Sequence, residues 1–202
     1  MNEDEKKIHE EYHRLKKAWD AKYERPSKLL DVHSKYECMN RITEFFSFIQ
    51  NNVGEVSRVA LLATSDPVGL CYLFKKYYGS RITIICDHPL LDRIGWYFEN
   101  KFDARVYTVN PMFESVHELV KDCDLVVFPE YEFFAPLDLI KPYGEKLTAA
   151  LHYIVWPCPG NSSFKVESVS DLLDNLNLKR VVAAGEYKNI DDKKGYFALG
   201  SR

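Results

Sequence analysis

The sequence lacks several features that would set it apart from ordinary globular proteins. None of its five cysteines stands in a C-x-x-C pair, and no apolar run approaches the roughly 20 residues that a membrane-spanning helix needs. There are no internal repeats and no low-complexity tracts. The formal net charge is -3, so the chain has no global positive field of the kind that attracts nucleic acid, although local basic patches remain compatible with it. These absences argue against a membrane protein and, more weakly, against a nucleic-acid partner.

The cysteine pattern and the length set the general class. Cys71, Cys86 and Cys123 sit in or beside apolar runs, where a free thiol behaves as a small hydrophobe. Widely spaced thiols of this kind favour a reducing, cytoplasmic environment, and the first residues are charged rather than apolar, unlike a signal peptide. A chain of 202 residues is long enough for one full hydrophobic core.

The stretch from residue 58 to residue 89 predicts a strand, a tight turn, a helix and a second strand. The apolar run Val59–Ala63 stops at the polar turn 64–67, and the run Ile82–Ile85 ends in Cys-Asp-His-Pro, with Asp87 as the acidic residue. Between them lies a helical pattern that Gly79 closes. Such a unit places a helix N-terminus and a carboxylate at the same edge of a parallel sheet, where nucleoside-like ligands bind.

Further along the chain, strands continue to alternate with helices. We expect strands at 104–109, 124–128, 151–156, 180–184 and 195–199, and helices at 90–102, 115–121 and 168–176, the last capped by Ser168 or Ser170. Long early connections indicate parallel pairing, whereas the short segment 185–194 indicates a terminal antiparallel hairpin. The pattern predicts a three-layer α/β Rossmann-like sheet, mostly parallel, with a C-terminal antiparallel hairpin.

Two helices precede this sheet, the second ending near Gly54, and we divide the chain into a helical extension, 1–54, and a Rossmann-like domain, 55–202. An apolar stripe on the first helix includes Tyr12, Trp19 and Tyr23. These helices could pack on the sheet, cap its ligand edge, or pair with another subunit to form a homo-oligomer.

Residues 9–13 match H-E-x-x-H, the spacing with which two histidines share a zinc ion. The surrounding helix is highly charged, and downstream only His33 comes into question as a third ligand. We therefore expect a solvated helix face and no metal site.

The strand ends carry a resemblance to a known family. Asp87 follows the second strand, Asn110-Pro111 the third, and Phe128-Pro129-Glu130-Tyr131 the fourth, while 140–144 forms a Lys-Pro turn before the fifth. With the terminal hairpin, this arrangement resembles the class I S-adenosylmethionine-dependent methyltransferases over about Val53 to Arg202. The segment 128–131 has some likeness to the Asn/Asp-Pro-Pro-Tyr motif of the amino-methylating members, with Phe128 in place of the first polar residue. The family's G-x-G turn after strand one corresponds to 63–69, where only Gly69 is a glycine.

The resemblance implies S-adenosylmethionine as cofactor and a role for each strand end. Asp87, with His88 beside it, would hold the ribose hydroxyls, and Asn110 would lie near the adenine. Glu130 and Tyr131 would face the substrate, with Glu130 able to accept a proton. The remaining implied cofactor contacts are Thr64, Ser65, Asp66, Gly69, Phe128 and Pro129.

Several of these residues also have plain structural interpretations. Asp87 suits a helix N-cap, as do Thr64, Ser65 and Asp66, and Tyr131 suits core or lid packing. The leading hypothesis is a methyltransferase acting on a small molecule or a protein side chain. The first alternative is a non-catalytic relative that docks partners through Tyr12, Trp19 and Tyr23. The second is an enzyme of another class that uses a nucleotide or the same cofactor.

Overall fold

The computed structural model describes residues 3–23, 35–62, 67–86, 91, 93–109, 116–129, 146–153, 166–188 and 194–201. The description below uses six helices and seven strands formed by these residues. The helices are α1 (Glu3–Tyr23), α2 (Lys35–Asn52), α3 (Val68–Tyr78), α5 (Gly95–Phe102), α6 (His117–Val120) and α7 (Val169–Leu176). The strands are β1 (Arg58–Leu62), β2 (Arg81–Ile85), β3 (Ala104–Tyr107), β4 (Leu125–Phe128), β5 (Leu147–Tyr153), β6 (Arg180–Lys188) and β7 (Lys194–Ser201).

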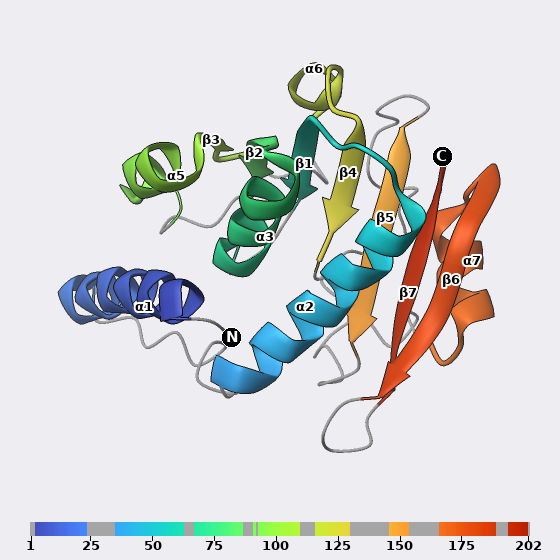
Figure 1. Ribbon diagram of the computed structural model, residues 1–202, viewed down its shortest axis with the longest axis horizontal. Coiled ribbons are helices and arrows are strands. Elements are labelled where there is room, and N and C mark those ends of the chain that lie inside the picture. The colour runs from blue at the N-terminus through green and yellow to red at the C-terminus, as the bar shows by residue number, and fades with distance from the viewer. Residues whose placement is uncertain are drawn as a thin grey trace.

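The strands form one sheet in the order β3-β2-β1-β4-β5-β7-β6 (Figure 1). The first five strands pair in parallel, whereas β7 lies antiparallel between β5 and β6. The predicted fold class is therefore confirmed, including the terminal hairpin.

Alternating side chains divide the core between the two faces of the sheet. In β1, Val59 and Leu61 belong to one hydrophobic cluster, whereas Ala60 and Leu62 belong to the other. The first cluster contains apolar residues of α1, α2, α3 and α5, and the second contains residues of α6 and α7. A sheet buried on both faces in this way forms the middle of three layers.

The N-terminal helices pack into the first of these layers. Tyr12 is 1% exposed and His9 3%. The Tyr97 hydroxyl donates a hydrogen bond to the Ile8 carbonyl at 3.2 Å, and Lys101 pairs with Glu11 at 3.0 Å. The expected solvated face around His9 is therefore wrong, because this side of α1 lies against α5.

Burial also changes what the aromatic stripe can do. Tyr12 packs edge-on against Phe98, with ring centroids 6.0 Å apart, so it cannot belong to an external docking face. The side chains of Trp19 and Tyr23 lie outside the described residues. The division of the chain at residue 54 stays a prediction, although Phe46 of α2 contacts Phe74 of α3 inside the same cluster.

Two local predictions need correction. The fifth strand begins at Leu147, not at residue 151, because its register with β4 begins by pairing Leu147 with Leu125. It is described as far as Tyr153, and residues 154–156 lie outside the described residues. Gly54 does not take the left-handed conformation of a C-cap, whereas Gly79 does, at φ 64°. The Gly79 N–H donates a hydrogen bond to the Lys75 carbonyl and the Ser80 N–H donates one to the Phe74 carbonyl, which closes α3 as predicted.

Two predictions about single residues are confirmed. The Ser168 hydroxyl caps α7 by accepting a hydrogen bond from the Asp171 backbone N–H at 3.1 Å. Cys71, Cys86 and Cys123 are buried thiols that form no disulfide bond within the described residues. Within the described ranges, no helix combines the length and the apolar character needed to cross a membrane.

Candidate functional site

The register of the parallel strands places their last residues in one line. Leu62 pairs with Ile85, and Ile85 with Tyr107, while Leu61 pairs with Val127 on the other side, so Phe128 lies level with Leu62. Neighbouring strands are about 4.8 Å apart, so the line extends over roughly 15 Å. We call this side of the sheet the C-terminal edge. It is the side on which open α/β sheets bind ligands.

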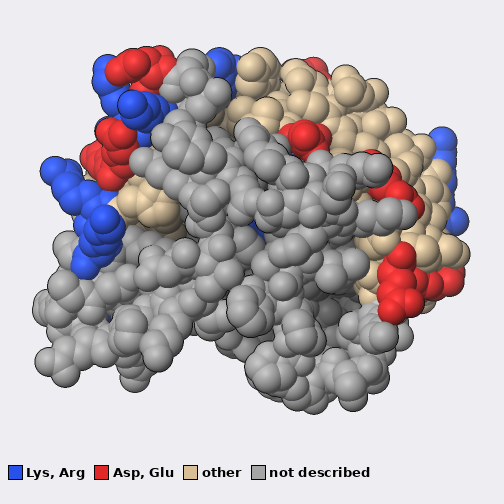
Figure 2. Space-filling view, turned by 90° about the horizontal axis from the view of Figure 1, so that it is seen from below, with Lys and Arg blue, Asp and Glu red and all other residues tan. Residues whose placement is uncertain are grey.

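Most of the predicted site residues follow these strand ends directly in sequence but lie outside the described residues. They are Thr64, Ser65, Asp66, Asp87, His88, Asn110, Glu130 and Tyr131. Their described chain neighbours Leu62, Ile85, Tyr107 and Phe128 all belong to the C-terminal edge. Figure 2 looks at the molecule from below, the side toward which β4 and β5 run in Figure 1.

Gly69 lies in the first turn of α3 and is buried. The helix begins after Pro67, whose carbonyl accepts a hydrogen bond from the Cys71 N–H at 2.9 Å. Because α3 follows β1, its N-terminus lies at the C-terminal edge, where the helix dipole and the first-turn N–H groups favour a negatively charged group. No acidic side chain occupies this first turn.

Phe128 and Pro129 are both buried at the end of β4, Phe128 with 0% exposure. The Phe128 ring belongs to the second hydrophobic cluster, together with Leu62 and Ile85. Its described role is therefore core packing beneath the strand ends.

Sequence reasoning missed two hydrogen bonds that contribute to this edge. Cys86 is buried directly after β2, and its N–H donates a hydrogen bond to the Tyr107 carbonyl at 3.1 Å, which joins the ends of β2 and β3. Near the end of β5, Tyr196 pairs with His152, and its hydroxyl donates a hydrogen bond to the Glu167 carbonyl. The apolar run before Asp87 was the one available signal, and it pointed to Cys86 only as core.

A charged side chain described at this edge is Asp171, in the first turn of α7. The Asp171 carboxylate accepts a hydrogen bond from the Glu167 N–H at 2.9 Å. This contact, followed by the hydrogen bond with the Ser168 side chain, lowers the pKa of Asp171. The result is a fixed negative charge beside the last strands of the sheet.

The described residues contain no group of three or more histidine, cysteine or acidic side chains arranged to hold a metal ion. The rings of His9 and His13 lie 6.3 Å apart, and His9 faces the core.

Comparisons with known proteins address the fold. No family model matches the sequence, and no curated protein matches it either. Solved structures do resemble it. One is a Burkholderia thailandensis 1,6-didemethyltoxoflavin-N1-methyltransferase with bound S-adenosylhomocysteine (11% identity, 96% of this chain and 89% of that chain, TM-score 0.58).

Two further structures show the same arrangement. One is the N-methyltransferase NodS from Bradyrhizobium japonicum (11% identity, 84% of this chain and 98% of that chain, TM-score 0.54). The other is an S-adenosylmethionine-dependent methyltransferase from Aquifex aeolicus (15% identity, 93% of this chain and 97% of that chain, TM-score 0.50). The chain has the fold of the class I methyltransferases.

Proposed function

We propose that the protein is an S-adenosylmethionine-dependent methyltransferase that acts on a small molecule or a protein side chain. One observation carries the proposal. The register brings the ends of β1, β2, β3 and β4 to one edge, and the residues suited to hold this cofactor follow those ends in sequence. A similar structure with bound S-adenosylhomocysteine supports this choice of ligand.

Chain connectivity limits how far the proposed site residues can lie from the strand ends. A residue advances the chain by at most about 3.6 Å, so Asp87 has its Cα within about 7 Å of that of Ile85, and Glu130 lies equally close to Phe128. In the proposed complex, the Asp87 carboxylate accepts hydrogen bonds from the ribose hydroxyls, with His88 beside it. Asn110 lies near the adenine.

The turn after β1 takes the methionine part of the cofactor. Its carboxylate would lie near the first-turn N–H groups of α3, where the helix dipole favours a negative charge. Gly69 lies in this first turn of α3. Thr64 and Ser65 supply hydroxyls, and Asp66 supplies a negative charge for the ammonium or the sulfonium.

The substrate side of the proposed site is formed by Glu130 and Tyr131. The cofactor supplies a methyl group on a positively charged sulfur, so the protein mainly has to align the acceptor with it. Where the acceptor atom carries a proton, Glu130 accepts it, and Tyr131 packs against the acceptor.

Calorimetric titration with S-adenosylhomocysteine tests the proposal. We expect one saturable site, and at least a tenfold weaker affinity in Asp87→Ala, because hydrogen bonds to a charged carboxylate contribute about 1.5–3 kcal/mol each. Asp174→Ala is the matched control, since Asp174 is exposed on α7 and should leave the affinity unchanged.

The substrate side needs a second variant. Glu130→Gln should bind S-adenosylhomocysteine like the wild type and lose turnover once an acceptor is found. Folded wild-type protein that binds neither S-adenosylmethionine nor S-adenosylhomocysteine would contradict the proposal and favour a non-catalytic relative.

A further inference from the structure

The opposite side of the sheet, at which the parallel strands begin, carries a row of arginines. We call Arg58, Arg81 and Arg105 the arginine row, and this side the N-terminal edge. Arg58 is the first residue of β1 and pairs in register with Arg81, the first residue of β2. Arg105 pairs with Thr83, two residues further along β2.

All three arginines are directed to the same face of the sheet. Side chains alternate along a strand, so Arg58 shares a face with Ala60 and Leu62, which belong to the second hydrophobic cluster. Ile85 of β2 and Tyr107 of β3 contact the same cluster, and they place Arg81 and Arg105 on that face too. The Cα atoms of Arg58 and Arg81 are thus about 5 Å apart, and those of Arg81 and Arg105 about 8 Å.

This concentration of positive charge has little internal compensation. Within the described ranges, the ion pair of the row joins Arg58 to Asp122 at 3.7 Å, between two well-exposed side chains, and such pairs contribute little. The nearby Asp124 carboxylate instead accepts the backbone N–H groups of Ser57 and Arg58, each at 2.9 Å. Neighbouring like charges on adjacent strands are unfavourable, so the row weakens the fold slightly.

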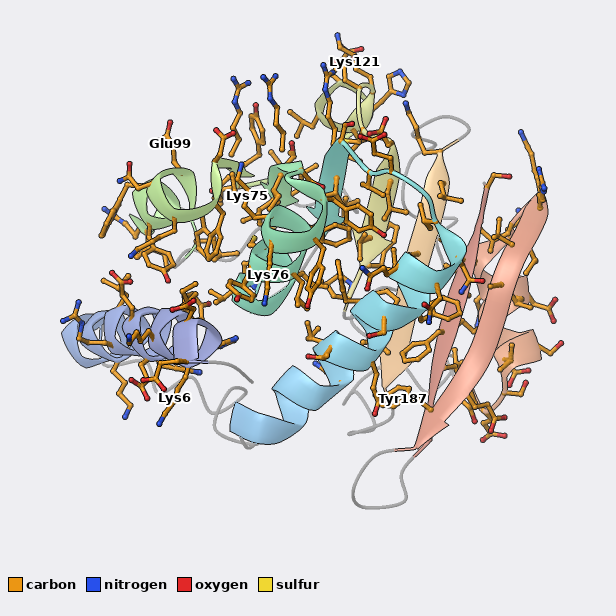
Figure 3. All side chains as sticks on the ribbon, in the orientation of Figure 1. Lys6, Lys75, Lys76, Glu99, Lys121 and Tyr187 are labelled. Carbon is orange, nitrogen blue, oxygen red and sulfur yellow. The ribbon has the colours of Figure 1, made fainter. Side chains whose placement is uncertain are left out.

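Further basic side chains extend the row along the same edge. Lys146 directly precedes β5, and its ammonium group donates a hydrogen bond to the Lys121 carbonyl at 2.5 Å. Figure 3 shows Lys121 at the end of the molecule where β1 and β4 begin, among other side chains tipped with nitrogen. Lys121 pairs with Glu118 at 2.7 Å, so the positive charge available at this edge comes mainly from the arginine row and Lys146.

The arginine side chains of the row favour phosphate groups as their ligand. A guanidinium group presents a planar fork of N–H donors that binds phosphate oxygens in pairs, whereas a lysine acts as a point charge. Three arginines whose Cα atoms are about 5–8 Å apart suit successive phosphates of one flexible strand better than a single small anion. Contacts of this kind carry no sequence information.

We infer that the arginine row docks the phosphodiester backbone of single-stranded nucleic acid, without sequence preference. The inference goes beyond the proposed methyltransferase function and does not depend on it. The N-terminal edge is separated from the C-terminal edge by the length of β1, about 13 Å, so docking here leaves the strand ends accessible.

Fluorescence anisotropy with a labelled 12-nucleotide single-stranded DNA of mixed sequence tests the inference. Wild-type protein should bind at low salt, and the logarithm of its affinity should fall with that of the salt concentration with a slope of about -2, as expected for three phosphate contacts. The variant Arg58→Gln/Arg81→Gln/Arg105→Gln should bind at least tenfold more weakly, with a slope near zero.

The matched control removes the same charge elsewhere. Lys6, Lys7 and Lys17 are exposed on α1, and Figure 3 shows Lys6 far from Lys121. Lys6→Gln/Lys7→Gln/Lys17→Gln should keep its affinity within about twofold, because it leaves the phosphate contacts intact. An equal loss in the control would overturn the inference, since binding would then follow net charge alone.

Two more results would overturn the inference. The first is wild-type protein that does not bind the DNA at low salt. The second is a labelled acidic peptide of equal charge that binds as tightly as the DNA, which would assign the row to an acidic protein segment. If the triple variant does not fold, Arg81→Gln/Arg105→Gln keeps the Arg58–Asp122 pair and should still lose most of the affinity.

Discussion

The two edges of the sheet are built from different kinds of contact. At the N-terminal edge, polar groups join neighbouring segments, as Asp124 does with the N–H groups of Ser57 and Arg58, and the Ser80 hydroxyl with the Val56 carbonyl at 2.5 Å. At the C-terminal edge, the described contacts are mainly buried apolar groups such as Leu62, Ile85 and Phe128. One edge thus fixes the strand starts through polar contacts, while the other forms an apolar platform next to the residues that we propose as cofactor contacts.

The largest expected change in stability comes from Phe128, and it distinguishes a role in core packing from a role in ligand contact at the C-terminal edge. Phe128→Ala should lower the free energy of unfolding by about 3–5 kcal/mol, because it empties a fully buried ring position. Urea unfolding followed by circular dichroism measures the change, with Phe128→Leu as the milder control. Unchanged stability together with weaker binding of S-adenosylhomocysteine would instead make Phe128 a ligand contact.

The next effect tests the N-terminal edge. Asp124→Ala leaves two backbone N–H groups without their carboxylate and should cost about 1–3 kcal/mol in unfolding free energy. Asp122→Ala is the control and should cost less than about 0.5 kcal/mol, because the contact that Asp122 makes among the described residues is its exposed pair with Arg58. Equal costs in the two variants would show that the carboxylate bonds do not fix the strand starts.

A smaller effect concerns the helix cap beside the C-terminal edge. Ser168→Ala removes the acceptor for the Asp171 N–H and should cost about 1 kcal/mol. Urea titration measures the loss, with Ser170→Ala as control, since Ser170 is exposed within the helix. A larger loss of stability in Ser170→Ala than in Ser168→Ala would show that Ser168 is not the N-cap of α7.

The hydrogen bonds of Asp171 at the same cap predict that the stability of the protein depends on pH. Because the pKa of Asp171 is lowered in the folded state, its contribution is present above the ordinary aspartate pKa, about 3.9, and is lost as the pH falls through the lowered value. Asp171→Asn should therefore be less stable than the wild type at pH 7, and the difference should shrink toward pH 3. A constant difference over this range would show that the charge does not contribute.

The smallest effect compares one thiol at each edge. Burial raises the pKa of Cys123 to about 11, so its thiolate is scarce at pH 8 and its reaction with iodoacetamide should be slow. Cys86 lies directly after β2, and its reaction should be slower with bound S-adenosylhomocysteine than without it. The reaction rate of Cys123 should be the same in both states. Peptide mass spectrometry measures both sites in one sample. Equal protection of both thiols would indicate general tightening of the fold rather than binding at one edge.

Much of the fold could be predicted from local patterns. Apolar runs of strand length, helical spacing between them and a short last connection were sufficient for the mostly parallel sheet and its terminal hairpin. Gly79 and Ser168 were recognisable because a left-handed C-cap and an N-cap depend on only a few neighbouring residues.

What could not be predicted depends on contacts between distant segments. The apolar stripe of α1 did not reveal that α5 covers it, so the sequence left the packing of Tyr12 open and the burial of His9 was missed. The arginine row is equally hidden, because Arg58, Arg81 and Arg105 become neighbours only through the register of three strands. At the candidate site, the sequence indicates which residues follow the strand ends, and the structure places those strand ends side by side.

Hydrogen–deuterium exchange with and without saturating S-adenosylhomocysteine tests the central claim most directly. If the C-terminal edge holds the cofactor, peptides that include the ends of β1, β2, β3 and β4 should gain protection, while the peptide around Asp122 and Asp124 should not change. Binding without protection at the strand ends, or with protection confined to the N-terminal edge, would contradict the account.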